Sequence, residues 1–259
     1  MLLPLACVVL ALGPLAVFAG FDSISFSPVQ QCGNFTVNFS GGKPPSALPL
    51  TLTVVPFNST PVFIEIPNSD WDDATLTGAA ITFLPFAAGT SFVASLDDAS
   101  GTGTGPVSDT MTVDTSDNST CLHTNTTSSA PRYTIDGTLA QCEPFSVLYD
   151  KALVDAPPTI RAFVPKNIST PVNLTVWTPG NASYTMDVLA GEQVVLLLSD
   201  DTGFHQTTDL VLVKGTGSSP TSCLAASAAT SQTSAAAASS GGLSTWVLRV
   251  HVIEALPHL

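Results

Sequence analysis

Basic side chains are scarce in this sequence. Seven Lys and Arg face twenty Asp and Glu in 259 residues, which gives a net charge of −13. A chain this acidic is repelled by nucleic-acid phosphates and by anionic membrane surfaces, so we exclude both as partners. Charged residues make up only 10% of the chain. Ser, Thr, Asn and attached sugars must therefore supply the polar surface.

Catalytic motifs are also missing. The chain contains neither a Gly-x-Ser-x-Gly elbow nor a His-Glu-x-x-His pair. Among its four histidines, only His205 lies within a strand-rich region, and we interpret it as a loop residue rather than a base. The run Gly101-x-Gly103-x-Gly105 lies between two strand-like segments, without a helix N-terminus to bind phosphate. It is typical of a hairpin loop, and the sequence as a whole predicts a protein that is not an enzyme.

The N-terminus predicts export. Residues 1–19 are almost entirely apolar up to Phe18, and Val17-Phe18-Ala19 places small residues at the two positions that signal peptidase reads. We interpret this segment as a cleaved signal peptide and expect a secreted, extracellular protein at the cell surface or in a cell wall. The alternative is an N-terminal membrane anchor, for which the apolar run is short.

Four cysteines remain once the signal, with Cys7, is removed. An even number of cysteines in a secreted chain indicates disulfides, here among Cys32, Cys121, Cys142 and Cys223. No two of them have the spacing of metal ligands.

Sequons for N-glycosylation are dense. Eight asparagines head an Asn-x-Ser/Thr sequence: Asn34, Asn38, Asn58, Asn118, Asn125, Asn167, Asn173 and Asn181. Behind a signal peptide, this number predicts a glycoprotein.

The chain contains an internal repeat. Gln31-Cys32 recurs as Gln141-Cys142, Ala88-Gly89 recurs as Ala190-Gly191, and each copy closes with a cysteine. The repeat selects Cys32–Cys121 and Cys142–Cys223 as the disulfides. We predict domain 1 at residues 20–121 and domain 2 at residues 132–223. Residues 122–131 between them have the composition of a stiff, glycosylated spacer rather than of a packed interface.

Each copy has the pattern of a β-sandwich. Short apolar runs alternate with period two and are broken by Pro, Gly, Asn and Asp. Because a glycosylated Asn must face water, Phe35, Val37 and Phe39 should face inward between Asn34 and Asn38. The same parity places Val172, Leu174 and Val176 inward, with Asn173, Thr175 and Trp177 outward. About seven strands in each copy fit an all-β, immunoglobulin- or fibronectin-like sandwich closed by one disulfide.

Three resemblances follow from these motifs. The segment 84–96, with the Gly-rich run and Ser108 after it, resembles the last third of a fibronectin type III domain. It is also similar to a Ser/Thr-rich, GPI-anchored fungal cell-wall domain linked to β-1,6-glucan synthesis. The whole layout of signal, two Gln-Cys-opened domains and Ser/Ala-rich stalk resembles a family of secreted proteins from mushroom-forming fungi. The last resemblance implies a cell-surface or cell-wall location and no particular activity.

Two groups of residues are candidate binding sites. The pairs Asp97-Asp98 and Asp200-Asp201 follow equivalent strands. We interpret them as solvated turns, with a weak Ca²⁺ site or a catalytic carboxylate pair as alternatives, and we expect no other cofactor. Trp71 and Trp177 are candidate ligand contacts, since an aromatic ring can stack on a sugar. For Trp71 we favour packing within its loop over contact with a ligand.

The C-terminal region has low complexity. Residues 224–245 are rich in Ser, Ala and Thr, and predict a disordered stalk. Residues 246–259 include Arg249, His251 and Glu254 and are too short and too polar to cross a bilayer. We expect a membrane anchor only if the natural C-terminus was lost from the gene sequence.

Two functions fit these features. The first is a non-catalytic extracellular module whose partner is a cell-wall polysaccharide or another extracellular protein. The second is binding or remodelling of β-glucan, which would need exposed aromatic side chains.

Overall fold

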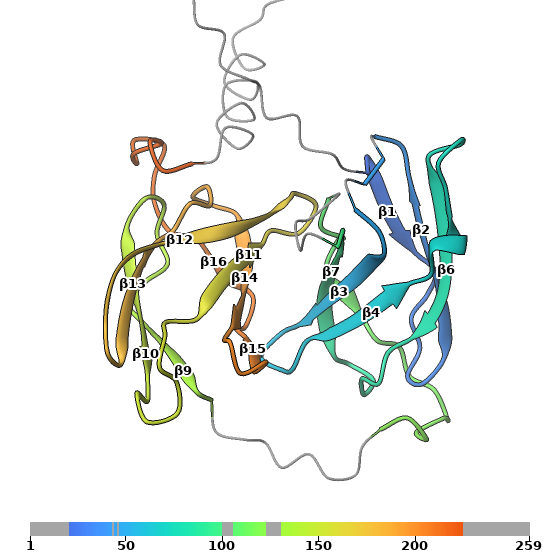
Figure 1. Cartoon of the computed structure of the whole chain (residues 1–259), viewed down its shortest axis with the longest axis horizontal. Helices are drawn as coiled ribbons and strands as arrows, with labels where there is room; N and C mark the ends of the chain where they lie inside the picture. The colour runs from blue at the N-terminus through green and yellow to red at the C-terminus, as the bar shows by residue number, and fades with distance from the viewer. Residues whose placement is uncertain (1–20, 43, 46, 100–105, 123–130, 225–259) are drawn as a thin grey trace, which may run out of the picture.

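The structure is a computed structural model that describes residues 21–224, except residues 43, 46, 100–105 and 123–130. The described residues are nearly all β and form two tandem sandwiches (Figure 1). The predicted signal peptide, the Gly-rich run 101–105, the Asn125 sequon and the C-terminal stalk lie outside the described residues. No helix among the described residues is long and apolar enough to cross a membrane.

Domain 1 consists of two sheets of four strands each. We name the sheet that faces domain 2 the inner sheet and the other the outer sheet. The outer sheet has the order β1 (Ser23–Phe26), β2 (Asn34–Ser40), β6 (Thr77–Phe83), β5 (Trp71–Asp72). The inner sheet has the order β4 (Val62–Ile66), β3 (Leu50–Pro56), β7 (Ser91–Asp97), β8 (Met111–Thr112). A short 3-10 helix, η1 (Asn68–Asp70), leads into β5.

Domain 2 repeats this arrangement with one difference. Its outer strands are β9 (Tyr133–Asp136), β10 (Pro144–Tyr149) and β13 (Asn181–Thr185). Its inner strands are β11 (Thr159–Phe163), β14 (Gln193–Ser199), β15 (His205–Thr207) and β16 (Val211–Leu212). The long strand β12 (Ser169–Thr178) pairs first with β11 and then with β13, so it belongs to both sheets. In domain 1 the separate strands β4 and β5 take these two roles.

Each sandwich has its own apolar core. In β2 the side chains of Phe35, Val37 and Phe39 are buried while Asn34 and Asn38 are exposed, so the predicted faces are confirmed. The same parity holds in β10 for Phe145, Val147 and Tyr149.

The predicted faces of β12 are wrong beyond Leu174. Val176 was expected to face inward, but it is 62% exposed and lies opposite Ser183. Leu174 lies opposite the buried Tyr184, on the predicted face, although its side chain is 42% exposed. A bulge at Thr175 shifts the pairing of β12 with β13, so that parity changes between Leu174 and Val176. The hydroxyl of Thr175 donates to the Ser183 carbonyl at 2.8 Å.

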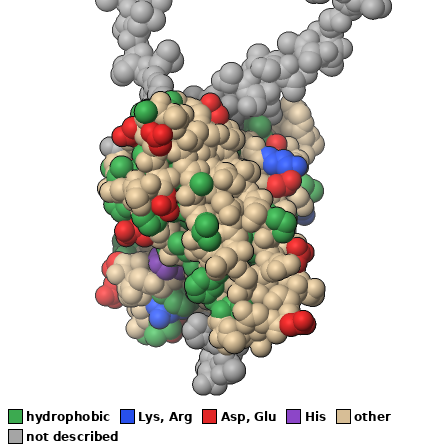
Figure 2. Space-filling model, turned by 90° about the vertical axis from the view of Figure 1, so that its right-hand side faces the viewer, with side chains coloured by type: hydrophobic (Ala, Val, Ile, Leu, Met, Phe, Trp, Pro, Cys, Tyr) green, Lys and Arg blue, Asp and Glu red, His purple; other side chains and the backbone are tan. Residues whose placement is uncertain are grey.

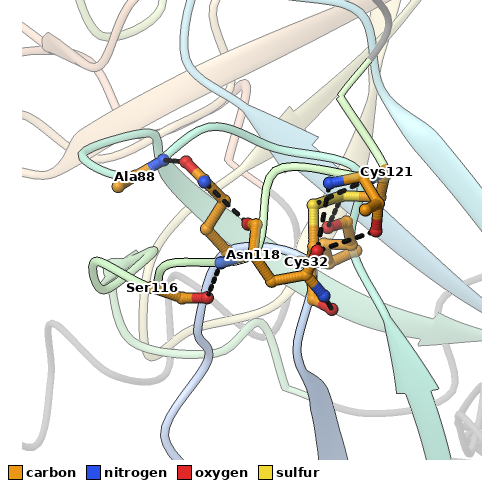
Figure 3. Close-up of a disulfide and its surroundings, with 8 residues drawn as sticks. Cys32, Ala88, Ser116, Asn118 and Cys121 are labelled. Carbon is orange, nitrogen blue, oxygen red and sulfur yellow. Dashed lines mark hydrogen bonds between the residues drawn. A yellow bond between two sulfur atoms is a disulfide. The ribbon is translucent and has the colours of Figure 1, made fainter.

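The two predicted disulfides are confirmed, and a glutamine reinforces each of them. Cys32 is bonded to Cys121, and Cys142 to Cys223. In domain 1 the Gln31 side chain accepts from the Ala88 N–H at 2.9 Å and donates to the Asn118 carbonyl at 2.8 Å (Figure 3).

Domain 2 has the same glutamine contacts. Gln141 accepts from the Ala190 N–H at 2.8 Å and donates to the Pro220 carbonyl at 2.6 Å. The repeated Gln-Cys and Ala-Gly motifs are therefore parts of one structural clamp, in which glutamine ties the loop before β7 or β14 to the segment that carries the closing cysteine.

Candidate functional site

The inner sheets of the two domains pack against each other. Six buried apolar side chains form a cluster between them: Val55, Val93 and Val107 from domain 1, and Phe163, Val195 and Leu197 from domain 2. The prediction of a spacer at residues 122–131 concerned that segment alone, most of which lies outside the described residues, and the packing of the sheets was not predicted. The strands β7 and β14 are buried on both faces because each sheet covers its own core on one side and the other domain on the opposite side.

Equivalent turns of the two domains make equivalent contacts. After β3, the N–H of Asn58 donates to the Thr208 carbonyl at 2.8 Å. After β11, the N–H of Lys166 donates to the Ser108 carbonyl at 3.1 Å. Asn58 and Lys166 also share a left-handed backbone, with φ of 51° and 61°. The interface thus has an approximate two-fold symmetry of the kind that relates the subunits of a homodimer.

One largely buried ion pair, in which the Asp97 side chain is 8% and the Arg161 side chain 18% exposed, breaks this symmetry. Arg161 on β11 donates to both carboxylate oxygens of Asp97 on β7, at 2.7 and 2.5 Å. The hydroxyl of Thr53 donates to the same carboxylate, and Ser169 accepts from Arg161 at 3.0 Å. Every charged atom of the pair is therefore hydrogen-bonded, as burial of charge requires. Arg161 was not singled out in the sequence, although an Arg in an otherwise apolar strand is an unusual residue there.

A groove of about 490 Å³ opens beside this ion pair, at one end of the interface. Its walls include Phe63 from domain 1 and Ser199 and His205 from domain 2. The His205 ring lies 4.9 Å from the Phe63 ring between centroids, and its Nδ1 is 2.8 Å from the Ser199 hydroxyl. No third described residue is hydrogen-bonded to the His205 ring. The arrangement places an imidazole and a hydroxyl group on the wall of a groove between the domains.

The predicted solvated turns are wrong for most of the acidic candidates. Asp97 and Asp98 are buried, with 6% and 4% exposure. Asp200 accepts from the Tyr133 hydroxyl at 2.6 Å and from the Thr202 hydroxyl at 2.6 Å. Burial would raise the pKa of Asp200, but the hydrogen bonds from Thr202 and Tyr133 outweigh it and lower the pKa to about 2. Only Asp201 is exposed, as a solvated turn requires.

The alternative calcium site receives no support from these contacts. The carboxylate oxygens of Asp97 and Asp200 are taken up by protein donors. Among the described residues, no three His, Cys, Asp or Glu side chains are grouped as metal ligands.

The two candidate tryptophans differ in exposure. Trp71 is 8% exposed and packs in the core of domain 1, stacked on Phe39 at 6.1 Å between ring centroids. This burial agrees with packing, the favoured interpretation of Trp71, and not with a ligand contact. Trp177 is 47% exposed near the end of the β12–β13 hairpin, so its ring is available to a ligand. Its exposure agrees with the predicted outward position, although its backbone pairs with that of the buried Ala182.

The described sequons lie in three places. Asn34 and Asn38 are exposed on the outer sheet of domain 1, and Asn173 and Asn181 on that of domain 2. The turns that contact the other domain carry Asn58 and Asn167, which belong to the interface. Asn118 lies beside the Cys32–Cys121 disulfide (Figure 3) and donates to the Cys32 carbonyl at 3.3 Å.

Comparisons with known proteins give only distant likenesses. No family model matches the chain, and no curated protein matches it. It is similar to a segment of two fibronectin type III domains from chicken tenascin, with 14% identity over 75% of this chain and 99% of that one and a TM-score of 0.25. It is also similar to domains FN1–FN3 of chicken CNTN1, with 10% identity over 76% of this chain and 68% of that one and a TM-score of 0.23.

A third similar structure is SGBP-B of a Bacteroides ovatus mixed-linkage glucan utilization locus, solved in complex with a mixed-linkage heptasaccharide. Its identity to this chain is 12% over 78% of this chain and 47% of that one, with a TM-score of 0.23. With TM-scores this low, the three likenesses carry no argument about ligand or activity.

Proposed function

We propose that this protein is a non-catalytic, extracellular glycoprotein that acts as an interaction module at a cell surface or in a cell wall. The observation that carries the proposal is the packed interface between the two inner sheets. It makes the two domains one structural unit. The outer sheets, which carry four sequons, remain exposed to solvent and to binding partners. The layout that resembles secreted proteins of mushroom-forming fungi supports a fungal cell wall as the setting.

The polar groups of the interface support a structural role for this site. Asp97 and Arg161 are engaged with each other and with Ser and Thr hydroxyls across the interface. A catalytic carboxylate or base needs a free atom that can reach substrate. These side chains instead hold the domains together.

Expression of the full chain in a filamentous fungus tests the proposal. We expect the protein in the cell-wall fraction or the medium, carrying N-glycans, and without hydrolytic activity on glucans, esters or peptides. Retention inside the cell would overturn the extracellular assignment. Turnover that is lost in His205→Ala and kept in the control His123→Ala would overturn the non-catalytic one.

A second candidate function is binding of β-glucan, which the half-exposed Trp177 favours. A pull-down on insoluble β-glucan would then retain the protein, and Trp177→Ala would lower the bound fraction several-fold. Val176→Ala on the same strand is the control and should bind as the wild type does. Absence of binding by the wild-type protein rules out this second function.

A further inference from the structure

Apolar side chains are exposed on the outer sheet of domain 1. Ile81 and Phe83 on β6 are 73% and 48% exposed, although a strand residue of this type is normally covered. Figure 2 views the molecule from this side and shows hydrophobic side chains in the middle of the face, with acidic side chains toward its borders. The described residues leave both side chains in contact with water. Their burial therefore requires another group, such as an attached sugar.

The pairing of β2 with β6 places a sequon beside each of these side chains. Asn34 lies directly opposite Phe83, and Thr36, the hydroxyl residue of the same sequon, lies directly opposite Ile81. Directly opposite residues of an antiparallel pair share a face, and their Cβ atoms are about 5 Å apart. A sugar attached to the Asn34 side chain therefore starts within one ring width of Phe83 and is diagonal to Ile81.

In domain 2 a sequon also lies beside exposed apolar side chains, but at a different position in the sheet. On its outer sheet, Asn181 lies directly opposite Leu148, which is 39% exposed. Val176 is 62% exposed and lies opposite Ser183, the hydroxyl residue of the Asn181 sequon. In domain 1 the equivalent of the Leu148–Asn181 pair is Asn38–Ala79, in which the sequon is on the other strand. The placement of a sequon asparagine opposite an exposed apolar side chain is therefore not explained by the internal repeat alone.

We propose that the first N-acetylglucosamine on Asn34 packs its apolar face against Phe83 and Ile81, and that the sugar on Asn181 packs against Leu148 and Val176. A pyranose ring presents a face of C–H groups, and burial of this face against an apolar side chain removes both from water. The glycans of the outer sheets then act as structural covers for the sheets. This inference rests on the proposed function, since the sugars are added only to an exported chain.

A double-mutant cycle on glycosylated protein tests the inference. Asn34→Gln and Phe83→Ser are made singly and together in protein secreted from a eukaryotic host, with occupancy of each sequon measured by mass spectrometry. We expect each single substitution to lower Tm by about 2 to 4 °C, and the double substitution to lower it by little more than either one. The matched control pairs Phe83→Ser with Asn38→Gln on the same strand, for which the two effects should add.

Two enzymatic treatments distinguish the contribution of the first sugar to stability from that of the remaining sugars. An endoglycosidase that leaves one N-acetylglucosamine on each Asn should leave Tm unchanged, whereas complete removal should lower it. A second cycle with Asn181→Gln and Leu148→Ser repeats the test in domain 2.

The outcomes distinguish this inference from the proposed function. If no sequon carries sugar, the glycoprotein assignment itself fails. If other sequons are occupied and Asn34 is not, or if Asn34 is occupied and the effects of the two substitutions add, only the present inference is overturned. A dimer of the glycosylated protein that Phe83→Ser dissociates would assign the face to a second copy of the chain, and would also overturn it.

Discussion

Asp187 in domain 2 is a buried carboxyl group with an unsatisfied oxygen. It is 7% exposed, and its Oδ1 has no hydrogen-bond partner among the described residues. Burial raises the pKa of Asp187 from its ordinary 3.8 to about 6. A buried polar atom without a partner costs free energy of folding, and the charged form costs more than the neutral form.

The substitution Asp187→Asn should therefore stabilise the protein in a pH-dependent way. Because the folded-state pKa lies above the unfolded one, the penalty is absent below about pH 4, grows between pH 4 and 6, and is complete above pH 6. We expect Asp187→Asn to raise the free energy of unfolding by about 1 to 3 kcal/mol at pH 8, and to leave it unchanged near pH 4. Urea unfolding at the two pH values measures this. An equal effect at both would contradict the prediction, and the exposed Asp201→Asn serves as the control.

The Asp97–Arg161 pair illustrates the opposite case, a buried charge with a full set of partners. Removal of one partner leaves the other charge buried and uncompensated, so Asp97→Ala should lower the free energy of unfolding by about 3 to 5 kcal/mol. The combined change Asp97→Leu with Arg161→Met removes both charges and should recover most of this loss. Guanidinium unfolding of the three proteins tests both statements. A loss below about 1 kcal/mol in Asp97→Ala would mean that the pair does not hold the interface.

At the scale of the strand, alternation was enough to predict some faces and not others. The faces of β2 and β10 follow from period two because each strand covers one core and pairs without interruption. In β12, a single extra residue at Thr175 reverses the parity of every residue beyond it. Nothing in the local pattern marks the position of such a bulge, so Val176 was assigned to the wrong face.

The interface was missed for a different reason. The run Val194–Leu198 in β14 is apolar at every position, which is typical of a strand buried on both faces. Period-two alternation assigns only Val194, Leu196 and Leu198 to the core of domain 2. The remaining side chains, Val195 and Leu197, pack against domain 1. The composition of the linker carried no information about the sheets that meet elsewhere.

Gly78 in β6 is required by the packing of two aromatic rings. Phe39 and Trp71 stack on the inner side of the outer sheet, and a Cβ at Gly78 would lie 2.0 Å from the Phe39 ring. We expect Gly78→Ala to lower the free energy of unfolding by about 1 to 3 kcal/mol, because the rings must shift to admit the methyl group. Thermal unfolding measures this loss. The control is Gly217→Ala, where a Cβ would have no neighbour within 4 Å. Equal stabilities of the two variants would show that the ring cluster can relax.

At the scale of the molecule, the two domains should behave as one unit. The interface combines a buried apolar cluster, an ion pair with a full set of hydrogen bonds, and backbone hydrogen bonds from the Asn58 and Lys166 turns. Each disulfide lies within one domain, so only the chain between Cys121 and Cys142 connects the halves covalently. The association of the halves therefore depends on the interface and not on the linker.

A protease site inserted between residues 122 and 131 tests this dependence. After cleavage, we expect the halves to elute together from a size-exclusion column at micromolar concentration, because burial of the apolar cluster and the ion pair does not need the linker. Val195→Arg places an unpaired charge inside the cluster and should separate the cleaved halves. The matched control Ile81→Arg changes an exposed residue of the outer sheet and should leave them together. Separation of the halves without any substitution would show that the linker, and not the packing of the inner sheets, keeps the domains in place.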